Sequence, residues 1–227
     1  MPNSYLIAKV TNFNEKILIT PNKQLSFLDE DGLNMTEGEG TTRMNYIEDF
    51  EVEGYSIQKY HIKMDYKVNK RGKVFDRFFN FYYQPNEFEM YFVKSENILF
   101  VRTQKDVAKE FLKQLNLHQP NLEYKILEIE LKTILNKIEK IKSAWINVSK
   151  DGINVESYHG NQVNNDQVVR KAIQNNTANY INFIYEFNDH EIYCGISKKG
   201  NINLYEDQLV EHNKLVLLFK IYTHLLK

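Results

Sequence analysis

The residues best suited to chemistry in this sequence are basic side chains that alternate along one segment. From Lys59 to Val68 the odd positions are polar and the even positions are apolar, a period of two that is typical of a half-buried β-strand. The alternation places Lys59, Lys63 and Lys67 on one solvent face. Lysines in a row beside aromatic rings can follow a phosphate backbone while bases stack on the rings. We therefore expect a nucleic-acid-binding surface made of Lys59, Lys63, Lys67, Lys70, Arg71, Lys73 and Arg77.

Charge is segregated around this strand, although the whole chain has 29 basic and 30 acidic residues. Residues 29–53 contain nine acids against Arg43, a local balance of −8, whereas residues 59–77 contain seven bases against two acids, a balance of +5. The near-neutral total therefore does not exclude a polyanionic ligand. Two simpler interpretations stay open, because solvent-facing lysines also prevent edge-to-edge strand pairing and the acidic segment could mask the basic one.

Motifs for catalysis and metal binding are weak. Glu130-Leu131-Lys132 has the letters of a nuclease Glu-X-Lys, but it falls on a predicted helix, where the geometry is wrong. His159 opens a polar loop and is the histidine best suited to acid–base chemistry. Residues 189–194 bring together Asp, His, Glu and Cys, yet zinc needs three or four converging ligands. We assign no catalytic residue and expect neither a metal nor a cofactor.

Composition narrows the class of protein. Cys194 is the only cysteine, so an internal disulfide is excluded, and the first residues lack a signal-peptide pattern. The longest apolar run, Leu215–Phe219, is far shorter than the about 20 residues of a membrane-spanning helix. We expect a cytoplasmic protein without membrane contact. Asn, Lys, Ile, Tyr and Phe supply 100 of the 227 residues, which indicates an AT-rich genome and suggests a bacterial or phage accessory system, such as phage defence or a mobile element.

The first half of the chain is expected to form an antiparallel β domain over residues 1–103. Period-two patterns predict strands at 5–10, 16–20, 57–68, 74–83, 89–93 and 98–103. Asn69-Lys70-Arg71-Gly72 is the predicted turn between the third and fourth of these strands, and Pro85 should end the fourth. Residues 29–53 lack a clear period and are predicted to form a long loop.

A helical hairpin is expected over residues 104–142. Its first helix begins near Gln104, and its second carries apolar residues spaced by 4, 3, 4 and 3 positions, namely Leu127, Leu131, Ile134, Ile138 and Ile141. This pattern fits a dimerising coiled coil. It also fits a helix packed on its own domain, which is the simpler interpretation because the seam is short.

The remaining residues, 143–227, are expected to form an α+β domain. Hairpins at 145–158 and 191–205 each precede a helix, which starts at Asp166 and Asp207 respectively, and an apolar strand at 180–187 lies between them. The ββα pattern could be a duplicated unit or two independent uses of common turns and helix starts.

These patterns together predict an α+β protein with an N-terminal antiparallel β domain, a central helical hairpin and a C-terminal antiparallel sheet with ββα units. The leading functional hypothesis is a non-catalytic cytoplasmic binding protein that contacts nucleic acid or a protein partner. A metal-dependent nuclease or hydrolase is one alternative, and a structural homodimer that self-associates through the helical hairpin is another. The sequence leaves the partner and the oligomeric state open.

Overall fold

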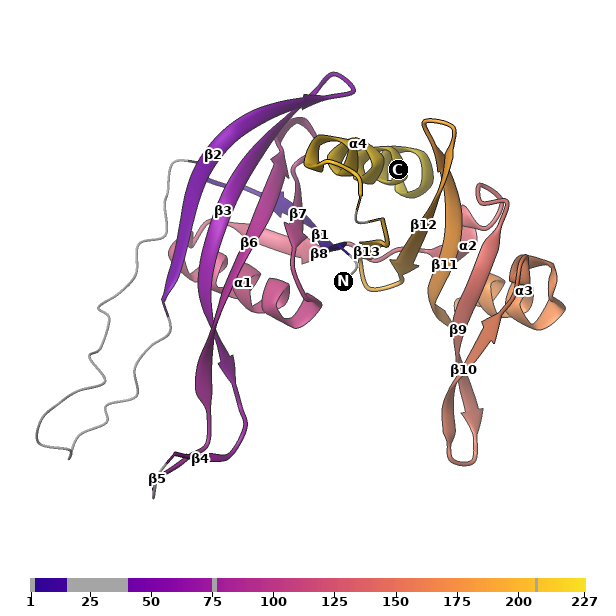
Figure 1. Cartoon of the computed structure of the whole chain (residues 1–227), viewed down its shortest axis with the longest axis horizontal. Coiled ribbons are helices and arrows are strands. Elements are labelled where there is room, and N and C mark those ends of the chain that lie inside the picture. Colours follow the sequence, from indigo (N-terminus) through magenta and orange to yellow (C-terminus); the bar gives the residue numbers. More distant parts are fainter. Residues whose placement is uncertain (1–2, 16–40, 75–76, 207) are drawn as a thin grey trace, which may run out of the picture.

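The computed structural model describes residues 3–15, 41–74, 77–206 and 208–227, with only the backbone of Val74, Arg77 and Phe79. These residues form one large antiparallel sheet with four α-helices, about half strand and a quarter helix (Figure 1). The predicted α+β class is confirmed.

The main sheet has eleven strands in the described part of the chain, and a separate short hairpin has two. The main strands are β1 (Asn3–Thr11), β2 (Thr42–Val52), β3 (Tyr55–Val68), β6 (Tyr82–Val93), β7 (Ile98–Arg102), β8 (Glu123–Ile126), β9 (Ile141–Lys150), β10 (Ile153–His159), β11 (Ala178–Phe187), β12 (His190–Ser197) and β13 (Asn201–Leu204); the short hairpin is β4 (Gly72–Val74) with β5 (Arg77–Phe79). The helices are α1 (Lys105–His118), α2 (Leu131–Ile134), α3 (Gln167–Gln174) and α4 (Glu211–Ile221).

Strand β1 joins the two halves of the sheet. The strand order is β10-β9-β11-β12-β13-β1-β7-β6-β3-β2, and β8 pairs with the end of β1 beyond β13. One edge of β1 therefore meets β13, near the C-terminus, and the other meets β7. We call β2, β3, β6 and β7 the N-terminal half of the sheet, and β9 to β13 the C-terminal half.

Helices cover opposite faces of the two halves. The buried face of α1, which includes Phe111 and Leu112, packs with Leu6, Tyr60 and Ile62 on one face. The other face, marked by Tyr5, belongs to a second core that contains α2, α3 and α4. Since neighbours on β1 point to opposite faces, α1 lies on one face of the sheet and α3 on the other (Figure 1).

The predicted second helix of the hairpin does not form. Its residues divide among β8, the single turn of α2 and the start of β9, because the backbone bonds elsewhere: Leu127 N–H donates to the Ile7 carbonyl, and Ile129 N–H to the Lys198 carbonyl. Tertiary pairing has overridden a helical period. Four of the five residues of the predicted 4, 3, 4, 3 pattern are buried in the core and at most 5% exposed, namely Leu131, Ile134, Ile138 and Ile141. The fifth, Leu127, is partly buried and packs against the core. The seam thus offers no surface for self-association.

The predicted turn at 69–72 is also wrong, because β3 pairs with β6 rather than with 74–83. The register runs from Ile57 opposite Val93 to Val68 opposite Tyr82. Pro85, expected to end a strand, lies within β6. It is tolerated because β7 ends opposite Glu89, so none of the described strands other than β3 pairs with β6 at Pro85 and needs its missing N–H.

Residues 42–52 form the edge strand β2 instead of a loop. A bulge between Tyr46 and Glu48 interrupts its alternation, which hid the strand in the sequence.

The predicted strand at 16–20, acidic residues 29–39 and Asp207 lie outside the described residues. Other predictions hold, including the start of α1, the two hairpins of the C-terminal half, and the cap of α3, where Asp166 accepts hydrogen bonds from Val168 N–H and Val169 N–H.

We predict that Leu131→Ala lowers the free energy of unfolding by about 2–5 kcal/mol, the cost of an apolar cavity in a well-packed core. Leu131 is 1% exposed, so no dimer is needed to explain its apolar character. Urea denaturation measures the change, and Lys132→Ala, next in the chain but exposed, is the control. A Leu131→Ala variant with wild-type stability and a lower oligomeric state would restore the coiled-coil interpretation.

Candidate nucleic-acid interface

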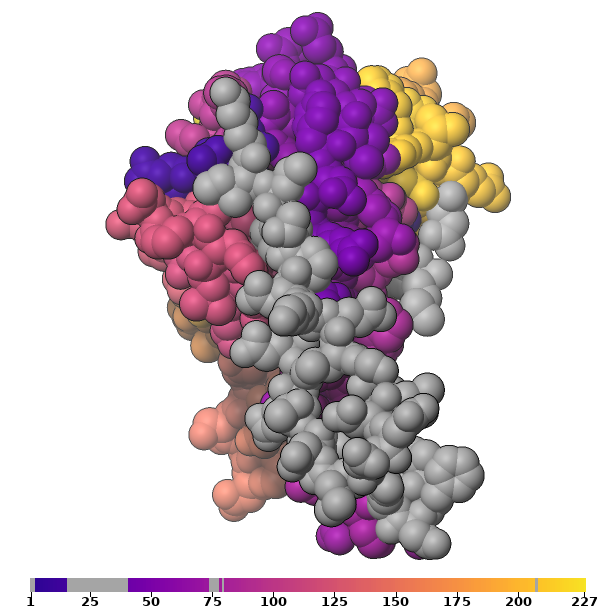
Figure 2. Space-filling model, turned by 90° about the vertical axis from the view of Figure 1, so that its left-hand side faces the viewer, coloured from indigo at the N-terminus to yellow at the C-terminus, as the bar shows by residue number. Residues whose placement is uncertain are grey.

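Strands β3 and β6 extend beyond the sheet as a two-stranded arm, residues 65–86. The register defines its base: β2 begins opposite Met64, and β7 ends opposite Glu89, so neither pairs with the arm beyond these points. The arm ends in the β4–β5 hairpin. It projects from the body in the same direction as the β9–β10 hairpin (Figure 1), and both reach the same end of the molecule in Figure 2.

The arm is basic and aromatic. In sequence it contains five bases against two acids, and it contains seven aromatic residues. One of the acids, Asp65, lies at the base, where its carboxylate accepts hydrogen bonds from Thr41 N–H and Oγ1–H. The described acidic residues of segment 29–53, whose charge balance is −8, do not mask the arm. Residues Glu48 to Val52 lie opposite Tyr55 to Lys59, at the end of β2 that is far from the arm.

Cationic groups lie over the aromatic rings of the arm. Lys67 Nζ is 3.8 Å from the centroid of the Phe81 ring, and Arg71 Cζ and Lys73 Nζ lie 5.1 and 5.5 Å from that of Phe78. Phe78 itself is 63% exposed. Each cation–π contact contributes about 0.5–1 kcal/mol at an exposed site, so the cations hold the rings in place while both remain at the surface.

Lys59 is the clearest departure from the predicted basic surface. It shares a face with Lys63 and Lys67, but α4 covers that end of the face, and the Lys59 side chain is only 11% exposed. Lys59 Nζ lies 2.6 Å from Glu211 Oε1, which also accepts a 2.6 Å hydrogen bond from Tyr91 Oη. Lys59 therefore ties α4 to the sheet and does not face a ligand.

The carboxylate of Glu211 is held in its charged form. Its burial alone would raise the pKa, but the hydrogen bonds from Lys59 and Tyr91, with the charges of Lys59 and Arg102, outweigh that effect and lower the pKa. Burial, followed by the bond to Glu211, raises the pKa of Tyr91, which therefore stays protonated and donates. This cluster anchors a helix and has no activated base.

The other predicted basic residues separate into neutralised and arm positions. Lys63 Nζ is 2.9 Å from Glu87 Oε1, and His61 Nε2 lies 3.4 Å from Glu87 Oε2, so this carboxylate offsets the charge just before the arm. Lys67, Lys70, Arg71 and Lys73 lie on the arm. Arg77 is in β5, and its side chain lies outside the described part of the structure.

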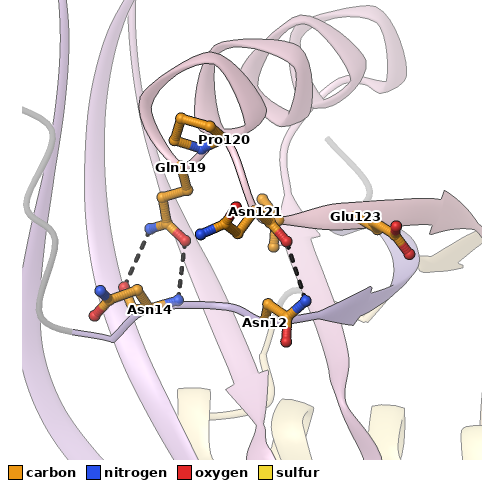
Figure 3. Close-up of a pocket in the computed structure, with 7 residues that line it drawn as sticks. Asn12, Asn14, Gln119, Pro120, Asn121 and Glu123 are labelled. Atoms are coloured by element: carbon orange, nitrogen blue, oxygen red, sulfur yellow. Dashed lines mark hydrogen bonds between the residues drawn. The ribbon is translucent and has the colours of Figure 1, made fainter.

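A polar depression of about 570 Å³ lies where β1 meets the end of α1 (Figure 3). Its polar groups already bond to one another: Asn14 N–H donates to Gln119 Oε1, Gln119 Nε2 donates to the Asn14 carbonyl, and Asn12 Nδ2 donates to the Asn121 carbonyl. These pairs fix the chain after β1 against the α1–β8 connection. The depression is explained by this structural role.

The motifs considered for catalysis do not converge. Burial raises the pKa of the Cys194 thiol to about 12, so it stays protonated, and its neighbours Glu191 and His190 are exposed. Glu191 pairs with Lys140. Within the described ranges, no three His, Cys, Asp or Glu side chains are grouped as a metal site. None of the helices described there is long and apolar enough to cross a bilayer.

Neither a protein-family model nor a curated protein matches this chain. The site must therefore be judged from its own geometry.

Phe78 and Tyr82 were missed as surface residues of this site. The predicted return strand at 74–83 placed Phe75, Phe79, Phe81 and Tyr83 on one face, whereas Phe78 in β5 is 63% exposed and Tyr82 at the start of β6 is 41% exposed. The available signal was the density of aromatic residues between basic ones in 65–86, which no buried strand requires. Glu211 could not be paired with Lys59 from sequence, because the two are far apart in the chain.

We predict that Glu211→Gln destabilises the protein by about 1–2 kcal/mol at neutral pH, less than a fully buried pair because 38% of the Glu211 side chain is exposed. The pKa of Glu211 is lower in the folded than in the unfolded protein, so this carboxylate stabilises the fold at every pH above its unfolded pKa. The stabilisation is lost as the pH falls from the unfolded pKa through the folded pKa. The gap between wild type and variant in urea denaturation should therefore shrink below about pH 4.3, the ordinary pKa of Glu. A gap that does not change with pH would contradict the assignment, and Glu123→Gln on an exposed strand is the control.

Proposed function

We propose that this protein binds nucleic acid without catalysis, and that the arm of residues 65–86 is the contacting element. The observation that carries the proposal is the combination of exposed cations and exposed aromatic rings on a projection that, among the described strands, has no further neighbour. A strand that served only to fill the sheet would end at Met64, where β2 begins. The extension of both β3 and β6 past that point costs conformational entropy without adding core.

Electrostatics favours a polyanion over a protein partner of mixed charge. Lys67, Lys70, Arg71 and Lys73 are close in sequence on the arm, whereas its only acid besides Asp65 is Asp76, which lies outside the described residues. A cluster of one sign attracts phosphates through release of their counterions, and the attraction weakens steeply with salt. By contrast, Lys59 and Lys63, on the same strand before the arm, are offset by Glu211 and Glu87.

The aromatic rings add a component that charge alone does not supply. Phe78 is 63% exposed with Arg71 and Lys73 beside its ring, so a base that stacked on the ring would bring its phosphate close to these cations. Stacking on a single ring requires an unpaired base.

We predict that the triple variant Lys70→Glu, Arg71→Glu and Lys73→Glu lowers affinity for single-stranded nucleic acid by at least about tenfold at moderate salt. The slope of log affinity against log salt should fall by about 2, roughly 0.7 for each lost phosphate contact. Fluorescence anisotropy of a labelled dT oligomer across a salt series measures both quantities.

The matched control reverses three lysines away from the arm, Lys113, Lys132 and Lys171, which are exposed and change the net charge equally. Equal losses in both triple variants would show a nonspecific charge effect. Full affinity and an unchanged salt slope in the arm variant would reject the arm as the contact.

We predict that Phe78→Ala lowers the same affinity about five- to 150-fold, the effect of removing one stacked base. The salt slope should stay as in the wild type, because no phosphate contact is lost. Phe78→Trp keeps a stacking surface and should retain affinity. If alanine and tryptophan behave alike, the ring does not stack on a base.

A further inference from the structure

The C-terminal half of the sheet has one face that none of the described helices covers. Helix α3 and the second core occupy one face of β9 and β11, and in Figure 1 α3 lies on the outer side of these strands. The opposite face, which we call the open face, carries one tryptophan, three tyrosines and a row of small polar residues; these are Trp145, Tyr180, Tyr193, Tyr205, Ser143, Asn182 and Asn203.

Polar residues form a continuous row across the open face. The register places His159 opposite Ser143, Ser143 opposite Asn182, Asn182 opposite Gly195, and Gly195 opposite Asn203 on consecutive strands. A sheet face that only packs against protein carries apolar side chains, as the other face of these strands does. The row therefore has a composition suited to hydrogen bonding rather than to packing.

Gly195 leaves room for an aromatic ring to lie across the sheet. A β-carbon at this position would lie 1.9 Å from Tyr180 Oη, so the Tyr180 side chain crosses β12 directly above the glycine. Its hydroxyl accepts a 2.9 Å hydrogen bond from Asn203 Nδ2 and lies 2.8 Å from Tyr205 Oη. Trp145 contacts the same ring at a centroid distance of 5.2 Å. The ring is fixed from three sides, which suits a platform for stacking.

Two buried acceptors on this face lack a partner in the described structure. Asn182 Nδ2 donates to Ser143 Oγ, and Asn201 Nδ2 donates to Ser4 Oγ, but the Oδ1 atom of each amide bonds to nothing described there. Asn182 is 6% exposed, and its Oδ1 lies above Gly195, under the edge of Tyr180. An unpaired buried acceptor is disfavoured, so packing alone does not account for the amide at this position.

Positive charge lies along the rim of the open face. Helix α1, which starts at Lys105, packs on the sheet face that carries Leu6. Leu6 lies opposite Asn201 across β1 and β13, and opposite residues share a face, so this face continues into the open face. The pKa of Lys105 is lowered first by burial and then by the charges of Lys109 and Lys199, with Asp106 opposing. These lysines would meet the phosphates of a ligand whose bases lie on the rings.

We propose that the open face binds unpaired bases of single-stranded nucleic acid, with Tyr180 and Trp145 as the stacking residues. The ligand class rests on the proposed function, but the residues are separate from those of the arm. Stacking rings and amides alone would also suit a neutral sugar, and the lysines at the rim favour a phosphate-bearing ligand.

Trp145 is the only tryptophan of the chain, so its fluorescence reports directly on the open face. Titration of the intact protein with a dT oligomer of about 16 nucleotides, the upper site size of a single-strand-binding fold, should quench the fluorescence of Trp145. A blunt-ended duplex of the same oligomer with its complement should leave the fluorescence unchanged, because its bases are paired. Tyr180→Ala should lower affinity about five- to 150-fold, and Tyr180→Phe much less, because the ring remains. Gly195→Ala should act like Tyr180→Ala by displacing the ring.

Tyr193→Ala and Tyr205→Ala, at exposed positions, give a second test if the Tyr180 variants fail to fold. Val168→Ala, exposed on α3 behind the sheet, is the matched control. Unchanged Trp145 emission at saturation, with saturation shown by anisotropy of the labelled oligomer, would overturn this inference and leave the arm intact. Loss of binding in the arm variant alone, with the Tyr180 and Tyr193 variants unaffected, would overturn it as well.

Four other outcomes also decide the question. Quenching of Trp145 that persists in the arm triple variant, at wild-type affinity, supports the open face and rejects the arm. Quenching by maltohexaose but not by the oligomer assigns the face to sugars. Trp145 emission that changes with protein concentration in the absence of ligand, together with dimers in sedimentation, assigns the face to a second copy of the chain. Equal quenching by duplex and single strand would rule out unpaired bases as the ligand.

Discussion

The pairing of β1 with β13 determines the rest of this structure. Asn3 lies opposite Leu204 and Leu6 opposite Asn201, so the first strand of the chain is inserted beside the last. Each half of the sheet would otherwise present an unpaired edge at this position, and exposed edges invite pairing with other chains. A ten-strand path through both halves exists only because this one ladder of hydrogen bonds joins them.

Helix α4 reinforces the same junction from one face. Glu211 at its start bonds to Lys59 and Tyr91 in the N-terminal half, and at the other end Lys220 reaches Glu53 while lying over the ring of Phe187 in the C-terminal half. The apolar side of α4 belongs to the core that continues under α3. A helix bonded to both halves limits their relative motion, so the arm and the open face are held on one frame.

The sequence predicted those parts of the fold that depend on neighbouring residues. Alternation identified β3, the stripe of α1 identified that helix, and Asp166 identified the start of α3, since each signal arises within a few residues. The parts that depend on distant residues were misassigned. Leu131 and Ile134 follow a helical period, yet the segment bonds to Ile7 and to the turn at Lys198, partners that no local pattern reveals. For the same reason Lys59 was placed at the surface, because the helix that covers it comes some 150 residues later in the chain.

The open face shows why composition can conceal a site as well as reveal one. Gly195 and Asn182 are unremarkable in sequence, and their meaning appears only when the register places them side by side with Tyr180 above them. A valine or isoleucine at Asn182 would suit the strand better and would remove an unpaired buried acceptor, so stability alone does not favour the residue present. Proteins keep such locally unfavourable choices where function requires them. The aromatic arm fits the same argument, since its exposed Phe78 adds nothing to either core.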